Sequence, residues 1–329
     1  MSTLLVTGGG GFVLCHLVRR WIGLDPANRA IVLDNSPYDD FARQFLADPR
    51  ILLRVGSVTD RSAWDALPDP GSITHIAHGA AVTSIRRLVD AAGLVGAVDA
   101  LQVNVMGVAE ALAFAARLPG LQRMVTVSSG SVYGPSSFYP DHRPMREDDP
   151  ARPDGWYALS KHVGEQLTAE AAVQGLPALC VRLSGVFGAL DRPTASREVN
   201  SVPRQLLHAA RDGKSLRLAG LTGGGDYLAA ADVANAICAL LSCDRLEHTL
   251  YNVADGKFTT LGTLAGLVPG LDWQESDVSV ADVVADPNQT SGRYGAYDIS
   301  RLTADTGWQP RPLAATIREY SDWLATHRF

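Results

Sequence analysis

The stretch TGGGGFVL, from Thr7 to Leu14, follows the apolar run Leu4-Leu5-Val6 near the start of the chain. Four consecutive glycines are too flexible for the interior of a strand or a helix. A strand, a glycine turn and a helix in immediate succession form the arrangement in which backbone N–H groups bind a pyrophosphate. This order predicts a nucleotide-binding turn, and a plain tight turn is the alternative.

An acidic residue follows the turn at the spacing that a dinucleotide site needs. The next apolar run, Ile31-Val32-Leu33, ends at Asp34. A carboxylate about 20 residues after the glycines can accept hydrogen bonds from the adenosine ribose hydroxyls. The same charge repels the 2′-phosphate of NADP, so the spacing favours NAD as the cofactor.

Short apolar runs alternate with longer segments of helical periodicity through the first half of the chain. Strands are expected at residues 3–7, 30–34, 51–55, 73–77, 123–128 and 178–183, and helices at 12–22, 104–117 and 156–173. Strands that are apolar throughout and alternate with helices imply a parallel sheet covered on both faces. The predicted fold class is α/β, a doubly wound, Rossmann-type parallel sheet with a smaller C-terminal substrate-binding lobe.

The alternation loosens after about residue 184, where the second part of the chain is expected to begin. We predict an NAD-binding domain at 1–183, a return segment around 226–254, and a substrate-binding lobe at 184–329. Within the later part, 201–212 and 231–242 look helical and 248–253 looks like a strand. The glycines at 223–225 lack a strand-to-helix context, which predicts a flexible loop.

Composition narrows the class of protein and of partner. The chain has 329 residues, 46% of them hydrophobic and 19% charged, as is usual for a globular protein. A net charge of −6 without a basic stretch argues against nucleic acid and membrane as partners. The four cysteines lack metal or disulfide spacing, and His75 and His78 would point to opposite faces of one strand. We therefore expect a cytoplasmic protein without a metal.

A serine, a tyrosine and a lysine form the candidate catalytic set. The run VTVSSGSVYG ends an expected strand in hydroxyl residues that include Ser129, and Tyr157 and Lys161 follow in YALSK. Tyrosine and lysine four residues apart share one helix face, so the ammonium can lower the phenol pKa from about 10. Tyr157 can then act as a general acid or base, while Ser129 stabilises the same substrate oxygen.

Together these motifs resemble the extended short-chain dehydrogenase/reductases, the NAD-dependent epimerase/dehydratase family. TGGGGFVL is similar to that family's TGxxGFxG, SSGSVYG to SS-x-x-VYG, and His75-Ile76-Ala77 to its HLA strand end. Likeness continues through RLSGVFG and the tail DIS…GWQP. The resemblance implies the following roles: Ser129, Tyr157 and Lys161 are catalytic, and Gly8, Gly10, Gly11, Phe12, Asp34, Ala77, Tyr157 and Lys161 bind NAD.

The sequence departs from the family pattern at several positions. The family's dehydratases carry an Asp-Glu pair where Gly130 and Ser131 stand, which argues against elimination of water. Two positions that contact a nucleotide-sugar diphosphate in the family are Gly185 and Gly225 here. Leu14 replaces a glycine whose role is close helix packing, so we expect it to affect packing rather than cofactor binding.

Substrate contacts are expected at Ser131 and Arg293. The favoured function is an NAD-dependent oxidoreductase that acts on a secondary alcohol or ketone of a sugar or sugar-like substrate, with Tyr157 as general acid and base. An NAD-retaining (nucleotide-)sugar 4-epimerase is the first alternative, and a non-catalytic NAD-binding sensor is the second. The resemblance also implies a homodimer formed through the helices at 104–117 and 156–173.

Overall fold

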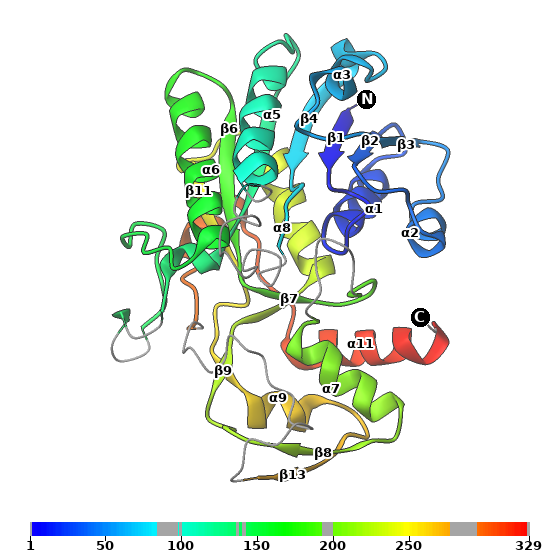
Figure 1. Ribbon diagram of the computed structural model, residues 1–329, viewed down its shortest axis with the longest axis vertical. Coiled ribbons are helices and arrows are strands. Elements are labelled where there is room, and N and C mark those ends of the chain that lie inside the picture. The colour runs from blue at the N-terminus through cyan, green and yellow to red at the C-terminus, as the bar shows by residue number, and fades with distance from the viewer. Residues whose placement is uncertain are drawn as a thin grey trace.

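A parallel sheet of seven strands forms the upper part of the molecule (Figure 1). Its order is β11-β6-β5-β4-β1-β2-β3, and every pairing is parallel. The strands are β1 (Thr3–Thr7), β2 (Arg29–Asp34), β3 (Ile51–Val55), β4 (Ile73–His78), β5 (Arg123–Ser129), β6 (Ala178–Leu183) and β11 (Leu250–Val253). The computed structural model describes residues 2–83, 98, 101–135, 138–139, 143–192, 200–276 and 295–327. The predicted doubly wound fold is confirmed.

Helices cover both faces of this sheet, and alternate residues of each strand point to opposite faces. Val6 and Val32 pack in the core under α1, whereas Leu5 and Leu33 pack in the core under α5. One face carries α1 (Leu14–Leu24), α2 (Asp40–Phe45) and α8 (Ala230–Ser242). The other carries α3 (Arg61–Asp65), the π-turn η3 (Gln102–Met106), α5 (Gly107–Ala115) and α6 (Trp156–Val173). Both α8 and β11 come from the expected return segment.

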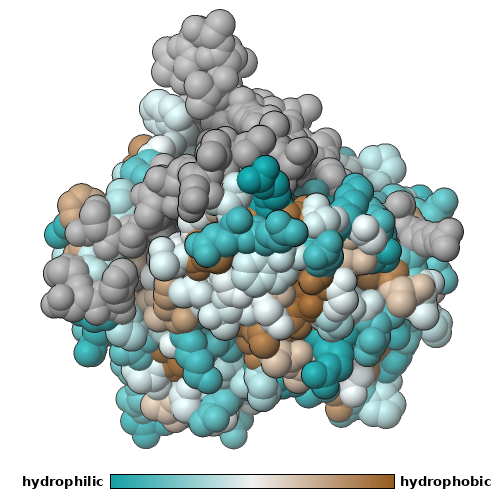
Figure 2. Space-filling model, turned by 90° about the horizontal axis from the view of Figure 1, so that it is seen from below, coloured by the Kyte–Doolittle hydropathy of each residue, from teal (hydrophilic) through white to brown (hydrophobic). Residues whose placement is uncertain are grey.

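A second lobe lies below the carboxyl ends of the strands and has its own apolar core (Figure 1). Its elements are β7 (Gly185–Phe187), α7 (Val202–Arg211), β8 (Ser215–Leu218), β9 (Gly224–Gly225), β10 (Tyr227–Ala229), β12 (Thr259–Thr260), α9 (Leu261–Leu267), β13 (Asp272–Glu275) and α11 (Leu313–Thr326). In Figure 2 the coloured surface of this end mixes hydrophobic residues with hydrophilic ones. Three short helices, η1 (Pro70–Ser72), η4 (Gly130–Tyr133) and α10 (Ser300–Thr306), complete the assignment. No helix in the described ranges has the length and apolar character needed to cross a membrane.

The expectation of a flexible loop at 223–225 is wrong. Gly224 and Gly225 form β9, which pairs in antiparallel fashion with Thr259 and Thr260. A Cβ atom on Gly224 would lie 2.7 Å from the Cα of Thr260 and closer still to the carbonyl oxygen of Thr259. Glycine therefore serves here to let two backbones approach each other.

Leu14 packs into space that a side chain at Gly79 would otherwise occupy. Leu14 opens α1 and is 4% exposed, and Gly79 directly follows β4. A Cβ atom on Gly79 would lie 3.2 Å from the Cγ of Leu14 and closer still to its Cδ1. The leucine that departs from the glycine motif is thus accommodated by a glycine on the neighbouring strand end.

This pairing predicts non-additive effects on stability. Leu14→Ala should lower the free energy of unfolding by about 2–5 kcal/mol, because it leaves a cavity beside Gly79. Gly79→Leu should also destabilise the protein, because it overpacks the same space. The double variant Leu14→Ala/Gly79→Leu should lose less stability than the two single changes add up to, measured by urea unfolding.

Leu24→Ala is the matched control, because Leu24 lies on the same helix and is 41% exposed. It should change the free energy of unfolding by less than about 1 kcal/mol. Strict additivity in the double variant would contradict the proposed sharing of space.

Candidate active site

A cleft of about 820 Å³ opens at the carboxyl ends of the parallel strands. Its walls come from the segments that follow β1, β2, β4 and β5. The strand order of the sheet reverses between β1 and β4, at the same place. Ligands of doubly wound sheets bind at such a reversal point. The cleft brings together these predicted residues: Gly8, Gly10, Gly11, Phe12, Asp34, Ser129, Ser131, Tyr157 and Lys161.

The glycine turn is packed too closely for side chains. Gly8 has a φ of +71°, and a Cβ on it would lie 2.8 Å from the Cα of Ala80. A Cβ on Gly10 would lie 2.9 Å from the ring of Tyr38. These glycines let the turn pack closely against its neighbours where it lines the cleft, which is the position of the predicted pyrophosphate cradle.

Asp34 stands at the end of β2 and is fixed by the turn itself. Its Oδ2 accepts a hydrogen bond of 3.0 Å from the N–H of Gly10, and its Oδ1 accepts one of 3.2 Å from Ser36. Burial raises the pKa of Asp34 above its ordinary value, and these hydrogen bonds oppose that rise. The carboxylate therefore lines the cleft beside the glycines, as an acceptor for ribose hydroxyls requires.

Ser129 ends β5 and faces the cleft at the start of η4. Its Oγ accepts a hydrogen bond of 3.2 Å from the N–H of Ser131. The Oγ of Ser131 is buried, and the described residues supply it with no hydrogen-bond partner. A buried polar atom without a partner is costly, and this one belongs to a residue that lines the cleft.

Tyr157 and Lys161 lie on consecutive turns of α6. The Nζ of Lys161 donates a hydrogen bond of 2.9 Å to the carbonyl of Val127 and lies 6.0 Å from the ring centre of Tyr157. Lys161 is only 7% exposed, and burial lowers its pKa to about 8. The ammonium is thus held between β5 and the phenol, in the relation that the sequence spacing predicted.

A buried carboxylate fastens the two elements that carry these residues. Glu165, one turn after Lys161 on α6, accepts a hydrogen bond of 2.6 Å from Ser128 Oγ. The same carboxylate receives two hydrogen bonds of 2.8 Å from the guanidinium of Arg182 on β6. The side chains of Glu165 and Arg182 are each 4% exposed. This arrangement fixes α6 to the strands beside the cleft.

Ala77 does not line the cleft, contrary to the role that the resemblance implied. It is fully buried inside β4, and the cleft is lined instead by Gly79, Ala80, Ala81, Val82 and Thr83. The strand continues to His78, one residue beyond the end that the sequence predicted.

Neither histidine of this strand is arranged for a metal. His78 Nδ1 pairs with Thr7 Oγ1 at 2.8 Å, and burial lowers the pKa of His78 to about 3. His75 instead contacts Trp21, with ring centres 4.8 Å apart. The described residues contain no cluster of three or more His, Cys, Asp or Glu side chains suited to a metal. Arg293, the other predicted substrate residue, lies outside the described residues.

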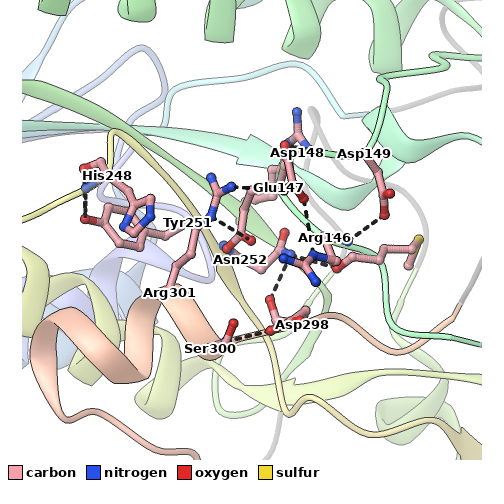
Figure 3. A network of polar contacts seen from close by, with 12 residues as sticks. Arg146, Glu147, Asp148, Asp149, His248, Tyr251, Asn252, Asp298, Ser300 and Arg301 are labelled. Carbon is pink, nitrogen blue, oxygen red and sulfur yellow. Dashed lines mark hydrogen bonds and ion pairs between the residues drawn. The ribbon is translucent and has the colours of Figure 1, made fainter.

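A polar network surrounds Asn252 (Figure 3). Asn252 on β11 donates from its backbone to Glu147 Oε1 at 2.8 Å and from its side chain to the carbonyls of Met145 and Asp298, both at 3.0 Å. Its Oδ1 accepts a hydrogen bond of 2.8 Å from Tyr133, which is fully buried. The network joins the segment before α6, the return strand and the segment before α10.

Sequence comparison finds relatives along the whole chain. Residues 4–254 match the model of the NAD dependent epimerase/dehydratase family. A dTDP-L-rhamnose 4-epimerase of Burkholderia thailandensis is 26% identical, over 98% of this chain and 94% of the relative. A UDP-glucose 4-epimerase of Mycolicibacterium smegmatis is 32% identical, over 93% of each protein.

Structural comparison agrees with this result. The crystal structure of a dTDP-glucose 4,6-dehydratase from Bacillus anthracis in complex with NAD superposes with a TM-score of 0.79. It is 19% identical and covers 100% of this chain and 98% of the other. This likeness concerns the fold. The family match and the relatives over nearly the full length lead to the conclusion that the chain belongs to the NAD dependent epimerase/dehydratase family, whose cofactor is NAD.

Proposed function

We propose that the protein oxidises a secondary hydroxyl of a sugar or a sugar-like molecule, as an NAD-dependent oxidoreductase of the extended short-chain dehydrogenase/reductase type. The observation that carries this proposal is that Ser129, Tyr157 and Lys161 line the same cleft as the glycine turn and Asp34. Bound NAD supplies the ability to accept a hydride from a carbon that bears a hydroxyl.

Each of the three residues has a distinct part in the proposed reaction. The Tyr157 phenol takes the proton of the substrate hydroxyl and returns it in the reverse direction. The Ser129 hydroxyl donates a hydrogen bond to the same oxygen and stabilises the charge that develops there. Lys161, buried beside Tyr157, keeps the phenol acidic through its positive charge and binds the nicotinamide ribose.

Two features of the site bear on which reaction follows oxidation. Elimination of water from a sugar needs an acid and a base next to the reacting carbon, and Gly130 and Ser131 supply neither. Gly185 and Gly225 lack side chains that could bind a diphosphate, although the curated relatives are named for nucleotide sugars. The experiment must therefore include both free sugars and nucleotide sugars.

The second candidate is a 4-epimerase that retains NAD. It is favoured by the names of two relatives, both 4-epimerases, one of them 32% identical to this chain. The same three residues would move the proton of the hydroxyl, while retained NAD would supply the ability to accept the hydride and return it to the opposite face of the sugar. The two functions differ in whether the reduced cofactor leaves the cleft.

The test is an assay of purified protein with NAD and a panel of D-glucose, D-glucuronate, UDP-glucose and dTDP-glucose. Absorbance at the reduced-nicotinamide band reports net oxidation, and proton NMR of the sugar reports epimerisation. We expect turnover of at least one sugar, and Tyr157→Phe should lower kcat by about 100-fold or more, because the phenol moves the proton. Tyr139→Phe, which removes a tyrosine hydroxyl bonded to the carbonyl of Tyr133, should retain activity.

Accumulation of reduced cofactor supports the oxidoreductase. Epimer formation without such accumulation supports the 4-epimerase instead. NAD binding without turnover of any sugar on the panel would contradict both and favour a sensor. Undiminished activity of Tyr157→Phe would contradict the proposed mechanism.

The affinity for NAD should depend on the protonation of Lys161. Since the pKa of Lys161 is lowered to about 8, its ammonium loses its proton as the pH rises through that value. If the charged form binds the ribose, the NAD affinity should be constant below about pH 7 and fall roughly tenfold by pH 9. Isothermal titration calorimetry at several pH values measures this profile.

Lys161→Met should bind NAD more weakly and without this pH dependence. Lys214→Met is the control, because Lys214 has an exposed side chain and pairs only with Asp212 at 3.7 Å among the described residues. It should keep the wild-type profile. A wild-type affinity that stays constant up to about pH 9 would exclude the proposed role of the ammonium.

We also propose that the protein forms a homodimer through α5 and α6, which lie side by side in Figure 1. Apolar side chains are exposed on this side of the molecule: Leu101 at 37%, Met106 at 52% and Leu159 at 38%. Apolar residues grouped on two adjacent helices are typical of an interface between copies.

The variant Met106→Glu/Leu159→Glu should therefore be monomeric, because charges at the end of η3, directly before α5, and on α6 disfavour the contact. Light scattering coupled to gel filtration measures the mass. Val55→Glu, at a 61% exposed position on the edge strand β3, should leave the mass unchanged. A wild-type mass near 35.0 kDa would contradict the dimer.

A further inference from the structure

The ring of Tyr297 fills the space where a side chain at Gly130 would lie. A Cβ atom on Gly130 would stand 2.5 Å from both Cε1 and Cζ of Tyr297, and closer still to the phenol oxygen. The backbone of Gly130 does not have a positive φ, so its conformation does not require glycine. The contact with the phenol does require glycine, because a Cβ atom at this position would come closer to the ring of Tyr297 than van der Waals radii allow.

The position of this phenol is fixed by its surroundings. Tyr297 is 2% exposed, and its ring meets the ring of Tyr133 edge to face at 5.7 Å. Its backbone N–H donates to Asp226 Oδ2 at 3.3 Å. The backbone of Met145 bonds to both neighbours of Tyr297 in the sequence. Its N–H donates to the carbonyl of Ala296 at 2.9 Å, and its carbonyl accepts from the N–H of Asp298 at 2.8 Å. Figure 3 shows Asn252 near Asp298, and the side-chain amide of Asn252 donates to the carbonyl of Asp298 at 3.0 Å.

Asp226 anchors the backbone behind the ring. This carboxylate is fully buried and also accepts hydrogen bonds from the N–H groups of Asp255, at 2.8 Å, and Gly256, at 2.9 Å. Tyr297 is thus attached to two segments of the second lobe at once. A side chain held in this way is preorganised, so it loses little further freedom on binding a ligand.

The phenol lies within reach of the reaction centre. Gly130 directly follows Ser129, and Tyr297 lines the same cleft as Ser129, Ser131 and Tyr157. Ser131 Oγ in that cleft has no partner among the described residues. A ligand oxygen bonded to Ser129 would therefore have the phenol of Tyr297, which comes from the second lobe, close to it.

We propose that Tyr297 is a specificity-determining residue, whose phenol hydroxyl hydrogen-bonds a sugar hydroxyl on a carbon next to the one that is oxidised. This inference rests on the proposed function, because it assumes a sugar in the cleft. A neutral phenol can both donate to and accept from a sugar hydroxyl. A sugar analogue that lacks this hydroxyl loses the hydrogen bond to the phenol, so it should bind more weakly than the parent sugar.

Tyr297→Phe tests the specificity, because it removes the hydroxyl and keeps the ring. The probes are UDP-glucose, dTDP-glucose, D-glucose and D-glucuronate, followed by the 3-deoxy and 6-deoxy analogues of whichever is turned over best. KM for the parent sugar should rise roughly tenfold while kcat changes little, the pattern of a lost binding contact. For one deoxy analogue, KM should be the same for both enzymes.

Tyr139→Phe is the matched control, because it removes a hydroxyl from the same aromatic cluster without touching the cleft lining. Its KM should equal that of the wild type. NAD affinity of Tyr297→Phe, measured by calorimetry, should also equal that of the wild type, which separates sugar binding from damage to the cofactor site.

The contact itself is tested without any sugar. Gly130→Ala should lower the urea midpoint of unfolding in the wild type, and this loss should be much smaller in a Tyr297→Ala background, where the space is free.

The outcomes separate the inference from the proposed function. Turnover with equal KM in wild type and Tyr297→Phe overturns the inference alone. Equal losses from Gly130→Ala in both backgrounds also overturn it. If the wild type binds NAD but turns over no sugar, the proposed function fails, and the specificity role of Tyr297 fails with it.

Discussion

The buried carboxylate of Glu165 is the constraint on which the arrangement of the site depends. It joins α6, β5 and β6. The carboxylate belongs to α6, and it accepts hydrogen bonds from Ser128 on β5 and from Arg182 on β6. Two charges at 4% exposure are stable in the interior only as a well-bonded pair, and removal of one partner typically costs about 3–5 kcal/mol. The Glu165–Arg182 pair therefore fixes the position of α6 along the strands, and with it the distance between Lys161 and the end of β5.

Departures from the family motif are compensated by residues from other parts of the chain. Leu14 stands where the motif has glycine, and Gly79 on the adjacent strand end leaves room for it. Gly130 removes a side chain next to Ser129, and the ring of Tyr297 takes up that space. In both cases a small residue and a large one divide a fixed volume, as close packing of protein interiors requires. A changed motif position is therefore best understood together with the neighbour that it touches.

Most of the sheet and much of the site could be predicted from local patterns. The strands at 3–7 and 51–55 and the helix at 156–173 were expected with the bounds that they have, because buried parallel strands and long helices carry strong signals. Ala77 was misassigned because no residue marks where β4 ends, and the strand continues to His78. β9 was missed because two glycines have no side chains to show a strand pattern, and only the approach of Thr259 and Thr260 explains them. The contact between Gly130 and Tyr297 joins distant parts of the chain, which sequence spacing alone does not reveal.

The origin of Tyr297 in the second lobe has a consequence for the order in which the protein is made. The glycine turn, Asp34 and the catalytic set are all encoded before residue 162, whereas the phenol beside Ser129 is added much later in the chain. At ordinary rates of synthesis this interval lasts roughly ten seconds or more. A nascent chain thus possesses the groups proposed for cofactor binding and catalysis before it possesses the phenol next to Ser129. Addition of that phenol couples the shape of the pocket to the folding of the whole protein.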